Sequence, residues 1–511
     1  MYKRQTQSHA NPATNTKVNN PEITNPESNS AGRIFKVGTL IQEQEQGRVP
    51  HRFRDAKVGS MMITINRARL EQLIAREAEL FRLSHPRSLQ LFEQAQQSLL
   101  GGVPMSWMMK WAGGFPLFFK EAHGSRLTDA DGHEYIDFCL GDTGAMPGHS
   151  PIATAQAIAR QAANGITTML HTEDAIWVGQ ELQRRFGLAL WQFTLTASDA
   201  NRFAIRIARE ITKRPKILVF NWCYHGSVDE AFITLNEGVA GARPGNVGPP
   251  VNPTVTTKVV EFNDIAALEA ALADGDVACV LTEPALTNIG IVLPDPGFHD
   301  ALRQLTQRTG TLLIIDETHT MSCGPGGYTG QHGLHPDMLT VGKSIGGGMP
   351  AAAFGVTESV AQRMFAQAEA DYVDTGGVGG TLAGNALSLA AIRATLSSVL
   401  TEEAFAQTVP LATRFTKGVQ SIIDGFSLPW SITQLGCRAE YRFRPTPPHN
   451  GGESAAAGDA ELDRYMHLYT LNRGILMTPF HNMALMAPQT KVEDIEHHDS
   501  VFRQAVEMLV R

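Results

Sequence analysis

The chain has 511 residues, 43% of them hydrophobic and 18% charged, with a formal net charge of −8 at pH 7. This length and composition predict a globular protein of about two or three domains, and the modest negative charge without a basic block argues against nucleic-acid binding. No apolar run approaches the roughly 20 residues of a membrane helix, and five cysteines without a C-x-x-C pair offer neither a disulfide framework nor a zinc motif. We expect a cytoplasmic protein that binds no metal.

The first segment, residues 1–60, is rich in Asn, Gln, Ser, Thr and Pro and repeats the phrases NPATN and NPESN. Such a composition buries too little apolar surface to offset the entropy of ordering the chain. We expect a disordered leader that is native, artificial or translated from upstream of a natural start at Met61 or Met62.

Residues 61–140 are predicted to form an N-terminal segment that begins with a helix. The stretch INRARLEQLIAREAELF places four apolar residues at helical spacing: Leu70, Leu73, Ile74 and Leu80. After the glycine-marked GGVP and GGFP, the sequence LFFKEAHGSRLTDADGHEYIDF is typical of two strands around a turn at 129–132.

Residues 141–395 alternate between helical and strand patterns. PIATAQAIARQAANG and ANRFAIRIAREITKR have helical patterns, whereas KILVF, KVVEF, VACVLTEP, TLLIID and MLTVG are short apolar runs typical of buried strands. Such alternation predicts βαβ units and a mainly parallel sheet, whose ligands bind outside the carboxyl ends of the strands. Four polar residues follow predicted strand ends: Tyr224, Glu283, Asp316 and Lys343. We expect them to share one site.

Residues 396–511 are predicted to form a smaller α+β domain. A helix over EEAFAQTVPLATRFTKGVQSII is followed by a strand over CRAEYRFRP, a loose PPHNGGESAAAGD stretch and further helices. We expect residues 61–140 to pack with this domain.

Lys343 is the central candidate for chemistry. It follows the apolar run MLTVG and precedes SIGGG, so that a compact loop can desolvate its amine, and a deprotonated lysine amine forms a Schiff base with an aldehyde. A surface lysine in a turn is the alternative. The sequence GKS does not make a nucleotide-binding P-loop, because Asp337 stands where that motif needs its first glycine.

Asp316 ends the apolar run LLIID and supplies a carboxylate near the same sheet edge. In pyridoxal phosphate (PLP) chemistry, a carboxylate partner keeps the ring nitrogen protonated so that the ring withdraws electrons. A structural ion pair or a helix cap is the alternative for Asp316.

A phosphate site is predicted where TLTASDANRFAIRIAR passes from a strand end into a helix. The backbone N–H groups of Ser198, Asp199 and Ala200 would bind the phosphate, provided that the Asp199 carboxylate turns away, and a plain capping motif is the alternative. In VFNWCYHGSVDE, Tyr224 and His225 follow another strand, where an aromatic ring can stack on a planar cofactor or simply pack in the core.

Together these features resemble the class III (ω-type) aminotransferases of PLP fold type I, most closely their glutamate-1-semialdehyde aminomutase-like branch. The resemblance covers about residues 88–500 and rests on GGVP, GGFPLF, DADGHEYIDF, GHSP, CYHG, TEPALTNIGIVLPDPGF, LLIIDETHT, GLHPDMLTVGKSIGGGMPAAAFG and GGTLAGNALSLAA. It implies an α/β fold in which a mainly parallel, seven-stranded type of sheet lies between helices in a large domain, and both chain ends build the smaller domain.

The resemblance also implies roles for individual residues. Lys343 would hold PLP covalently and move a proton as general base and acid, Asp316 would pair with the pyridine nitrogen, and Tyr224 would stack on the ring. Ser198 and Asp199 match the positions whose backbone holds the phosphate.

Thr381 matches the threonine that reaches the phosphate of a neighbouring subunit. The resemblance therefore implies a homodimer whose two active sites are shared across the interface.

Two departures from the family pattern bear on the substrate. Thr318 stands where the family has a valine after D-E, and Met108, in GGVPMSWMMKW, stands where the aminomutases carry an arginine that binds the substrate carboxylate. Trp107 and Met108 are then expected to line an apolar pocket, with core packing as the alternative. Arg438 is our candidate for binding a carboxylate, and Glu283 completes the expected pocket.

We therefore predict a ping-pong aminotransferase that moves an amino group between a hydrophobic amine or amino acid and a keto acid, aldehyde or ketone. A PLP-dependent aminomutase, racemase or decarboxylase is the alternative. A catalytically silent binding protein of the same fold is a further one.

Overall fold

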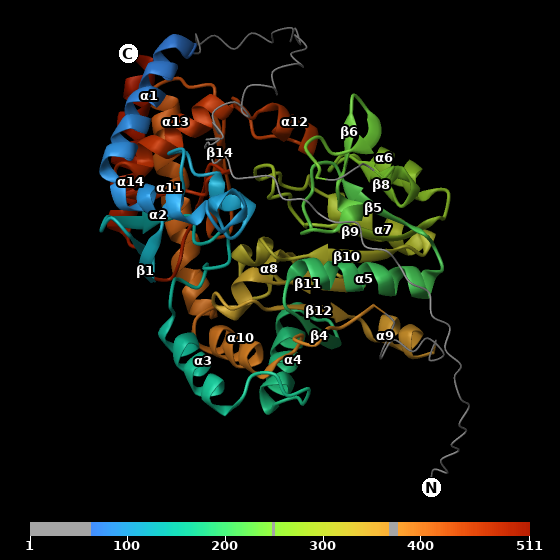
Figure 1. The fold of residues 1–511 in the computed structure, drawn as a ribbon. Coiled ribbons are helices and arrows are strands. Elements are labelled where there is room, and N and C mark those ends of the chain that lie inside the picture. Colours follow the sequence, from blue (N-terminus) through green and yellow to red (C-terminus); the bar gives the residue numbers. More distant parts are fainter. Residues whose placement is uncertain (1–62, 248–250, 367–376) are drawn as a thin grey trace, which may run out of the picture. The chain divides into compact units, whose positions relative to one another are not determined.

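A computed structural model gives the fold of residues 63–247, 251–366 and 377–511 (Figure 1). The leader predicted over residues 1–60 lies outside these described residues, as do Met61 and Met62. Within the described residues, no helix is long and apolar enough to cross a membrane.

A seven-stranded sheet forms the centre of the described structure. Its strands are β4 (Leu190–Thr194), β5 (Lys216–Phe220), β8 (Thr257–Val260), β9 (Val277–Thr282), β10 (Leu312–Asp316), β11 (Met338–Val341) and β12 (Ala352–Val356). They lie in the order β4-β12-β11-β10-β9-β5-β8, and only β12 runs antiparallel to its neighbours. The predicted mainly parallel sheet is confirmed.

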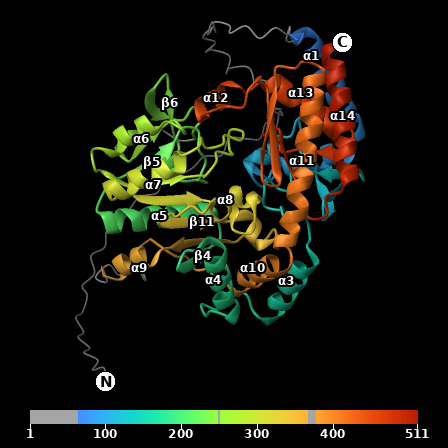
Figure 2. The same ribbon diagram turned by 180° about the vertical axis from the view of Figure 1, so that it is seen from behind.

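Helices cover both faces of this sheet (Figures 1 and 2). The α-helices between residues 152 and 398 are α3 (Ile152–Asn164), α4 (Glu173–Phe186), α5 (Ala197–Thr212), α6 (Ile265–Leu272), α7 (Phe298–Thr309), α8 (Gly327–His332), α9 (Glu358–Phe365) and α10 (Ala386–Ser398). Alternate residues of β10 pack into different cores: Ile314 joins the core that includes α5, and Ile315 joins the core that includes α7. Because both faces of the strand are covered, its sequence is apolar up to its last residue, Asp316.

The N-terminal segment differs from the prediction in two details. It contains α1 (Arg67–Ser84), α2 (Pro86–Ala95), the 3-10 turns η2 (Leu100–Gly102) and η3 (Ser106–Met109), and three strands: β1 (Phe119–His123), β2 (Arg126–Asp129) and β3 (Glu134–Asp137). We expected two strands, but Gly124, with φ 56°, allows a tight turn between β1 and β2. Leu80 is 42% exposed, and Phe81 packs into the core in its place.

The C-terminal segment contains α11 (Glu402–Gly425), β13 (Ser431–Leu435), β14 (Arg438–Arg442), α12 (Gly451–Ala456), α13 (Ala460–Leu471), β15 (Ile475–Leu476), β16 (Met483–Leu485) and α14 (Val492–Val510). The stretch predicted to be loose includes α12, because the side chain of Asn450 accepts a hydrogen bond from the Glu453 N–H and caps this helix. Strand β15 pairs with β3 of the N-terminal segment. The domain boundaries at 140 and 395 stay predictions.

Two elements between β5 and β8 had no counterpart in the prediction. The strands β6 (Ile233–Asn236) and β7 (Val239–Ala242) form a separate two-stranded hairpin. A residue with positive φ, Glu237, and the following Gly238 form its turn.

Candidate active site

The carboxyl ends of four adjacent strands carry the four predicted polar residues. Lys343 follows β11, Asp316 ends β10, Glu283 follows β9 and Tyr224 follows β5, and these strands are neighbours in the sheet. In a parallel sheet such residues lie at the same edge.

The amine of Lys343 lies between an acid and an imidazole. Its Nζ is 2.8 Å from Oδ2 of Asp142, 3.1 Å from the Asp142 carbonyl oxygen and 2.9 Å from Nε2 of His319. Lys343, Asp142 and Thr143 all have left-handed backbones, with φ of 49°, 50° and 80°. Non-glycine residues are rarely held in this conformation, and such strain gathers at functional sites.

The two partners of Lys343 differ in charge. Burial raises the pKa of Asp142, but the charge of Lys343 and nearby cations hold that pKa well below its usual value, so Asp142 is an anion. Burial and the charge of Lys343 lower the pKa of His319, which is therefore neutral. Nδ1 of His319 lies 3.2 Å from Nη1 of Arg438 and 3.0 Å from the Thr143 hydroxyl. With its proton on Nδ1, His319 donates to the Thr143 hydroxyl and accepts from an ammonium at Nε2; with its proton on Nε2, it accepts from Arg438 and donates to the lone pair of a neutral amine.

The sequence prediction missed Asp142 and His319. Asp142 comes from a loop 201 residues before Lys343, and only the fold brings it there. Two signals were available: Asp142 is a charged residue between glycines in LGDTG, and His319 follows the strand-end aspartate in DETHT.

The buried carboxylate of Asp316 accepts three hydrogen bonds. Its Oδ2 accepts hydrogen bonds from His225 Nδ1 at 2.9 Å and from Asn201 Nδ2 at 2.8 Å, and its Oδ1 accepts one from the Thr318 N–H at 3.0 Å. Burial raises the pKa of Asp316, but the hydrogen bond and charge of His225 lower it to about 2. Asp316 is therefore ionised at neutral pH. Asn201, on α5, was not predicted.

The N-terminus of α5 is capped by Thr196, which the sequence prediction also missed. The Thr196 hydroxyl lies 3.2 Å from the Asp199 N–H, which donates to it, and 2.9 Å from the Asp199 carboxylate, which accepts from it. The Asp199 amide is thus already used, which leaves the amides of Ala197 and Ser198 at the first positions of the helix. The Ser198 hydroxyl accepts a hydrogen bond from the Ser227 N–H at 3.0 Å.

The predicted substrate-pocket residues fall into two groups. Arg438 is fully buried and donates to the Thr287 carbonyl at 2.9 Å, with Glu440 at 3.4 Å. Glu283 is also buried, and burial raises its pKa to about 7 despite a hydrogen bond from the Thr287 hydroxyl. Trp107 lies with its ring centroid 5.6 Å from that of Tyr224, and Met108 is 42% exposed. Met108 is therefore not a core residue.

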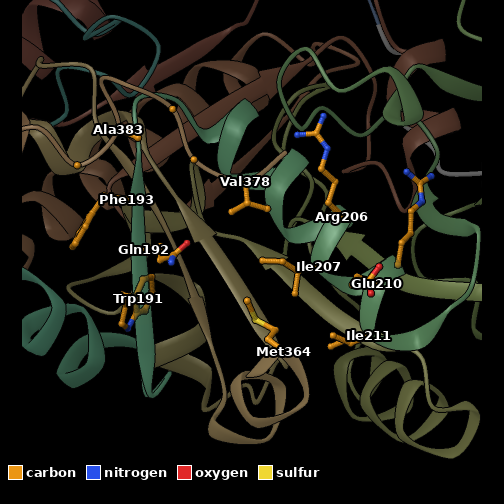
Figure 3. A pocket seen from close by; sticks show the side chains of 14 residues that line it. Trp191, Gln192, Phe193, Arg206, Ile207, Glu210, Ile211, Met364, Val378 and Ala383 are labelled. Atoms are coloured by element: carbon orange, nitrogen blue, oxygen red, sulfur yellow. The ribbon is translucent and has the colours of Figure 1, made fainter. Parts of the chain in front are cut away.

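A separate cavity of about 710 Å³ opens between β4, α5 and α9 (Figure 3). It is lined mainly by apolar side chains such as Trp191, Ile207 and Met364, and neither Lys343 nor Asp316 lines it. A neighbouring cavity is lined by Asp199 and Thr381 of the same chain. The charged contacts around Lys343, and not these volumes, define the candidate active site.

Comparison with known proteins gives consistent matches. The model of the family "Aminotransferase class-III" matches residues 107–506. A glutamate-1-semialdehyde 2,1-aminomutase of Sorangium cellulosum is 34% identical over 82% of this chain and 96% of its own length.

Two solved structures extend the comparison. A glutamate-1-semialdehyde-aminomutase from Pseudomonas aeruginosa PAO1 is 50% identical, with a TM-score of 0.86 over 87% of this chain and 99% of its own, and a variant of it was solved in complex with PMP. An omega-transaminase from Sphaerobacter thermophilus is 27% identical, with a TM-score of 0.74 over 82% of this chain and 97% of its own.

The described residues fit PLP. Asp316 is an ionised carboxylate with unused acceptor capacity, and the Thr318 hydroxyl is buried without a hydrogen-bond partner among the described residues, so that it can meet a polar ring substituent. At Gly226 a Cβ would overlap the Ser198 hydroxyl, so this glycine allows the loop to approach the start of α5. At position 318, where the family resemblance implies a valine, this chain has a threonine whose hydroxyl can hydrogen-bond.

The comparisons favour the aminomutase alternative over the transaminase that we predicted first. That prediction gave much weight to Met108, whereas similarity over most of the chain points to aminomutases. With a matching family model, a matching fold and a fitting cofactor site, this chain belongs to the class III aminotransferase family and is a PLP-dependent enzyme.

Proposed function

We propose that this chain is a PLP-dependent aminomutase, which exchanges an amino group and a carbonyl oxygen between neighbouring carbons of a small amino aldehyde of the glutamate-1-semialdehyde kind. The similarity to named aminomutases supports the substrate class. The single structural observation that carries the proposal is the Lys343 amine, held 2.8 Å from the Asp142 carboxylate and 2.9 Å from the His319 imidazole at the sheet edge that also holds Asp316.

PLP, when bound, withdraws electrons from the carbon whose proton is moved and carries the amino group. The chain's own residues would hold it there. Asp316 would place a negative charge at the ring nitrogen, the Ala197 and Ser198 amides at the start of α5 would bind the phosphate, and Tyr224 would cover the ring.

Lys343 would then take a proton from one carbon and return it to the next. A general base and acid works best when both of its protonation states are stabilised at the operating pH. The Asp142 carboxylate accepts from the ammonium, and His319, in the tautomer that carries its proton on Nε2, can donate to the free amine. The proton can therefore leave and return without a large reorganisation of the site.

An amine transaminase is the second candidate, favoured by Met108. An arginine is expected at this position in the aminomutases, and a thioether cannot pair with a carboxylate. A substrate with an apolar side chain would suit Met108 and Trp107 better.

Incubation of the holoenzyme with glutamate-1-semialdehyde, followed by identification of the products, separates the two candidates. An aminomutase converts many equivalents to 5-aminolevulinate, because the amino group and the carbonyl oxygen stay within one product molecule. A transaminase can use the aldehyde of a second substrate molecule as its acceptor, so it releases a dicarbonyl and a diamine in equal amounts. Formation of this pair in place of 5-aminolevulinate would overturn the aminomutase proposal.

Two further expectations stay proposals. A homodimer in which Thr381 reaches the partner's phosphate is supported by the family resemblance, and light scattering of the purified holoenzyme tests it. A cytoplasmic location is supported by the five cysteines, which are all free and buried. Export of the tagged protein from the cytoplasm would contradict it.

A further inference from the structure

Lys110 follows the turn η3, where the family's arginine is missing. Its own N–H donates to the Trp107 carbonyl at 2.9 Å, which closes the turn. Its Nζ lies 5.5 Å from the ring centroid of Trp107 and 5.0 Å from that of Phe480. The ammonium is therefore held where a loop of the N-terminal segment meets the loop before β16.

The side chain of Lys110 is exposed, and its ammonium forms no ion pair with a carboxylate of the described residues. Burial by the surrounding atoms lowers its pKa, and no described carboxylate offsets this effect. Two aromatic rings stabilise a cation only weakly at an exposed site. The N–H donors of Lys110 therefore remain available to an incoming anion.

A series of neighbouring side chains connects Lys110 to the reactive amine. The ring of Trp107 lies 5.6 Å from that of Tyr224. Burial raises the pKa of Tyr224, and so does the nearby charge of Asp142, which itself contacts Lys343. Trp107 and Tyr224 thus separate a cation from the site of the proton transfer.

The other candidates for binding a substrate anion are less available. Arg438 is fully buried behind His319 and already contacts a carbonyl and a carboxylate. Met108 carries no charge. A substrate carboxylate near Asp142 would be repelled, so the anionic end of a substrate has to lie away from Lys343.

We propose that Lys110 binds the carboxylate of the substrate at the end remote from the reacting carbons, in place of the arginine that the family resemblance implies at position 108. The proposal rests on the proposed function for the chemical class of this substrate. Trp107 and Phe480 orient the ammonium, and Lys110 selects for an anionic group over a neutral one of the same shape.

Binding of valerate and of valeramide to the holoenzyme tests this assignment, because the two molecules have the same length and differ in charge. Calorimetric titration of the wild type should show about ten-fold tighter binding of valerate, as expected for a charge-assisted hydrogen bond. Lys110→Met should reduce this preference to about two-fold or less, and Lys110→Arg should keep most of it.

Lys120→Met is the matched control, since it removes the same charge from the exposed strand β1 and should leave the preference unchanged. The assignment is wrong if the wild type shows no preference for valerate, or if Lys110→Met retains it. Because the titration requires no turnover, a failure of the aminomutase assay leaves this result interpretable.

Discussion

Glu283 makes the structure sensitive to pH in a direction that can be worked out. Its carboxyl is 2% exposed, its Oε1 has no hydrogen-bond partner among the described residues, and burial raises its pKa from 4.5 to about 7. The pKa of Glu283 is higher in the folded state than in the unfolded chain. The contribution of protonated Glu283 to the free energy of unfolding is therefore fully present below about pH 4.5 and is lost as the pH rises through about 7. At about 1.4 kcal/mol per pKa unit, the charged carboxylate costs about 3 kcal/mol at pH 8.

We therefore expect Glu283→Gln to stabilise the protein at pH 8 but hardly at pH 5. The amide keeps the shape and can still accept the hydrogen bond from Thr287. For a chain of this length the unfolding entropy is about 1 kcal/mol per degree, so the midpoint should rise by about 3 °C at pH 8 and by less than about 1 °C at pH 5.

Thermal unfolding of the holoenzyme, followed by circular dichroism at both pH values, measures this difference. Glu71 on α1 is exposed, and Glu71→Gln is the control. It should shift the unfolding midpoint by the same small amount at pH 5 and at pH 8. An equal change for Glu283→Gln at pH 5 and pH 8, or a lower midpoint at pH 8, would refute the reasoning.

Three further substitutions test the cofactor site. Asp316→Asn removes the charge that we place at the ring nitrogen and should lower kcat by about 100-fold or more, and near-normal turnover would contradict that role. Gly226 has a φ of 79°, and the Cβ added by Gly226→Ala would overlap the Ser198 hydroxyl. Chemical denaturation should therefore show that the free energy of unfolding falls by about 1–3 kcal/mol. An unchanged midpoint would contradict the close approach of the two residues. Asp142→Asn keeps the shape beside Lys343 but not the charge, and kcat should fall by about 10- to 100-fold with little change in the circular dichroism spectrum. A kcat close to that of the wild type would argue against this role of Asp142.

The fold was predictable where one physical rule dominates. Strands such as VACVLT and LLIID are buried on both faces, so their sequences are apolar runs up to the last residue. The turn at Gly124 was missed because a single glycine between polar residues leaves no pattern in hydrophobicity. Similarly, helical spacing does not decide between the adjacent Leu80 and Phe81, and packing against the rest of the chain selects Phe81.

The candidate site was predictable only for residues that are attached to the sheet. Asp316 and Lys343 end or follow strands, and the sheet order places them side by side. Asp142 reaches the lysine from a loop far away in the sequence, which no local pattern encodes. Thr196 was overlooked because the prediction started the phosphate site at Ser198, inside the helix and two residues after the cap.

The central claim is that the amine of Lys343 holds PLP. Reduction of the holoenzyme with borohydride, followed by proteolysis and mass spectrometry, tests it directly. We predict that the added cofactor mass falls on the peptide that contains Lys343 and is absent from Lys343→Ala. Cofactor mass on another lysine, or full turnover by Lys343→Ala, would contradict the account.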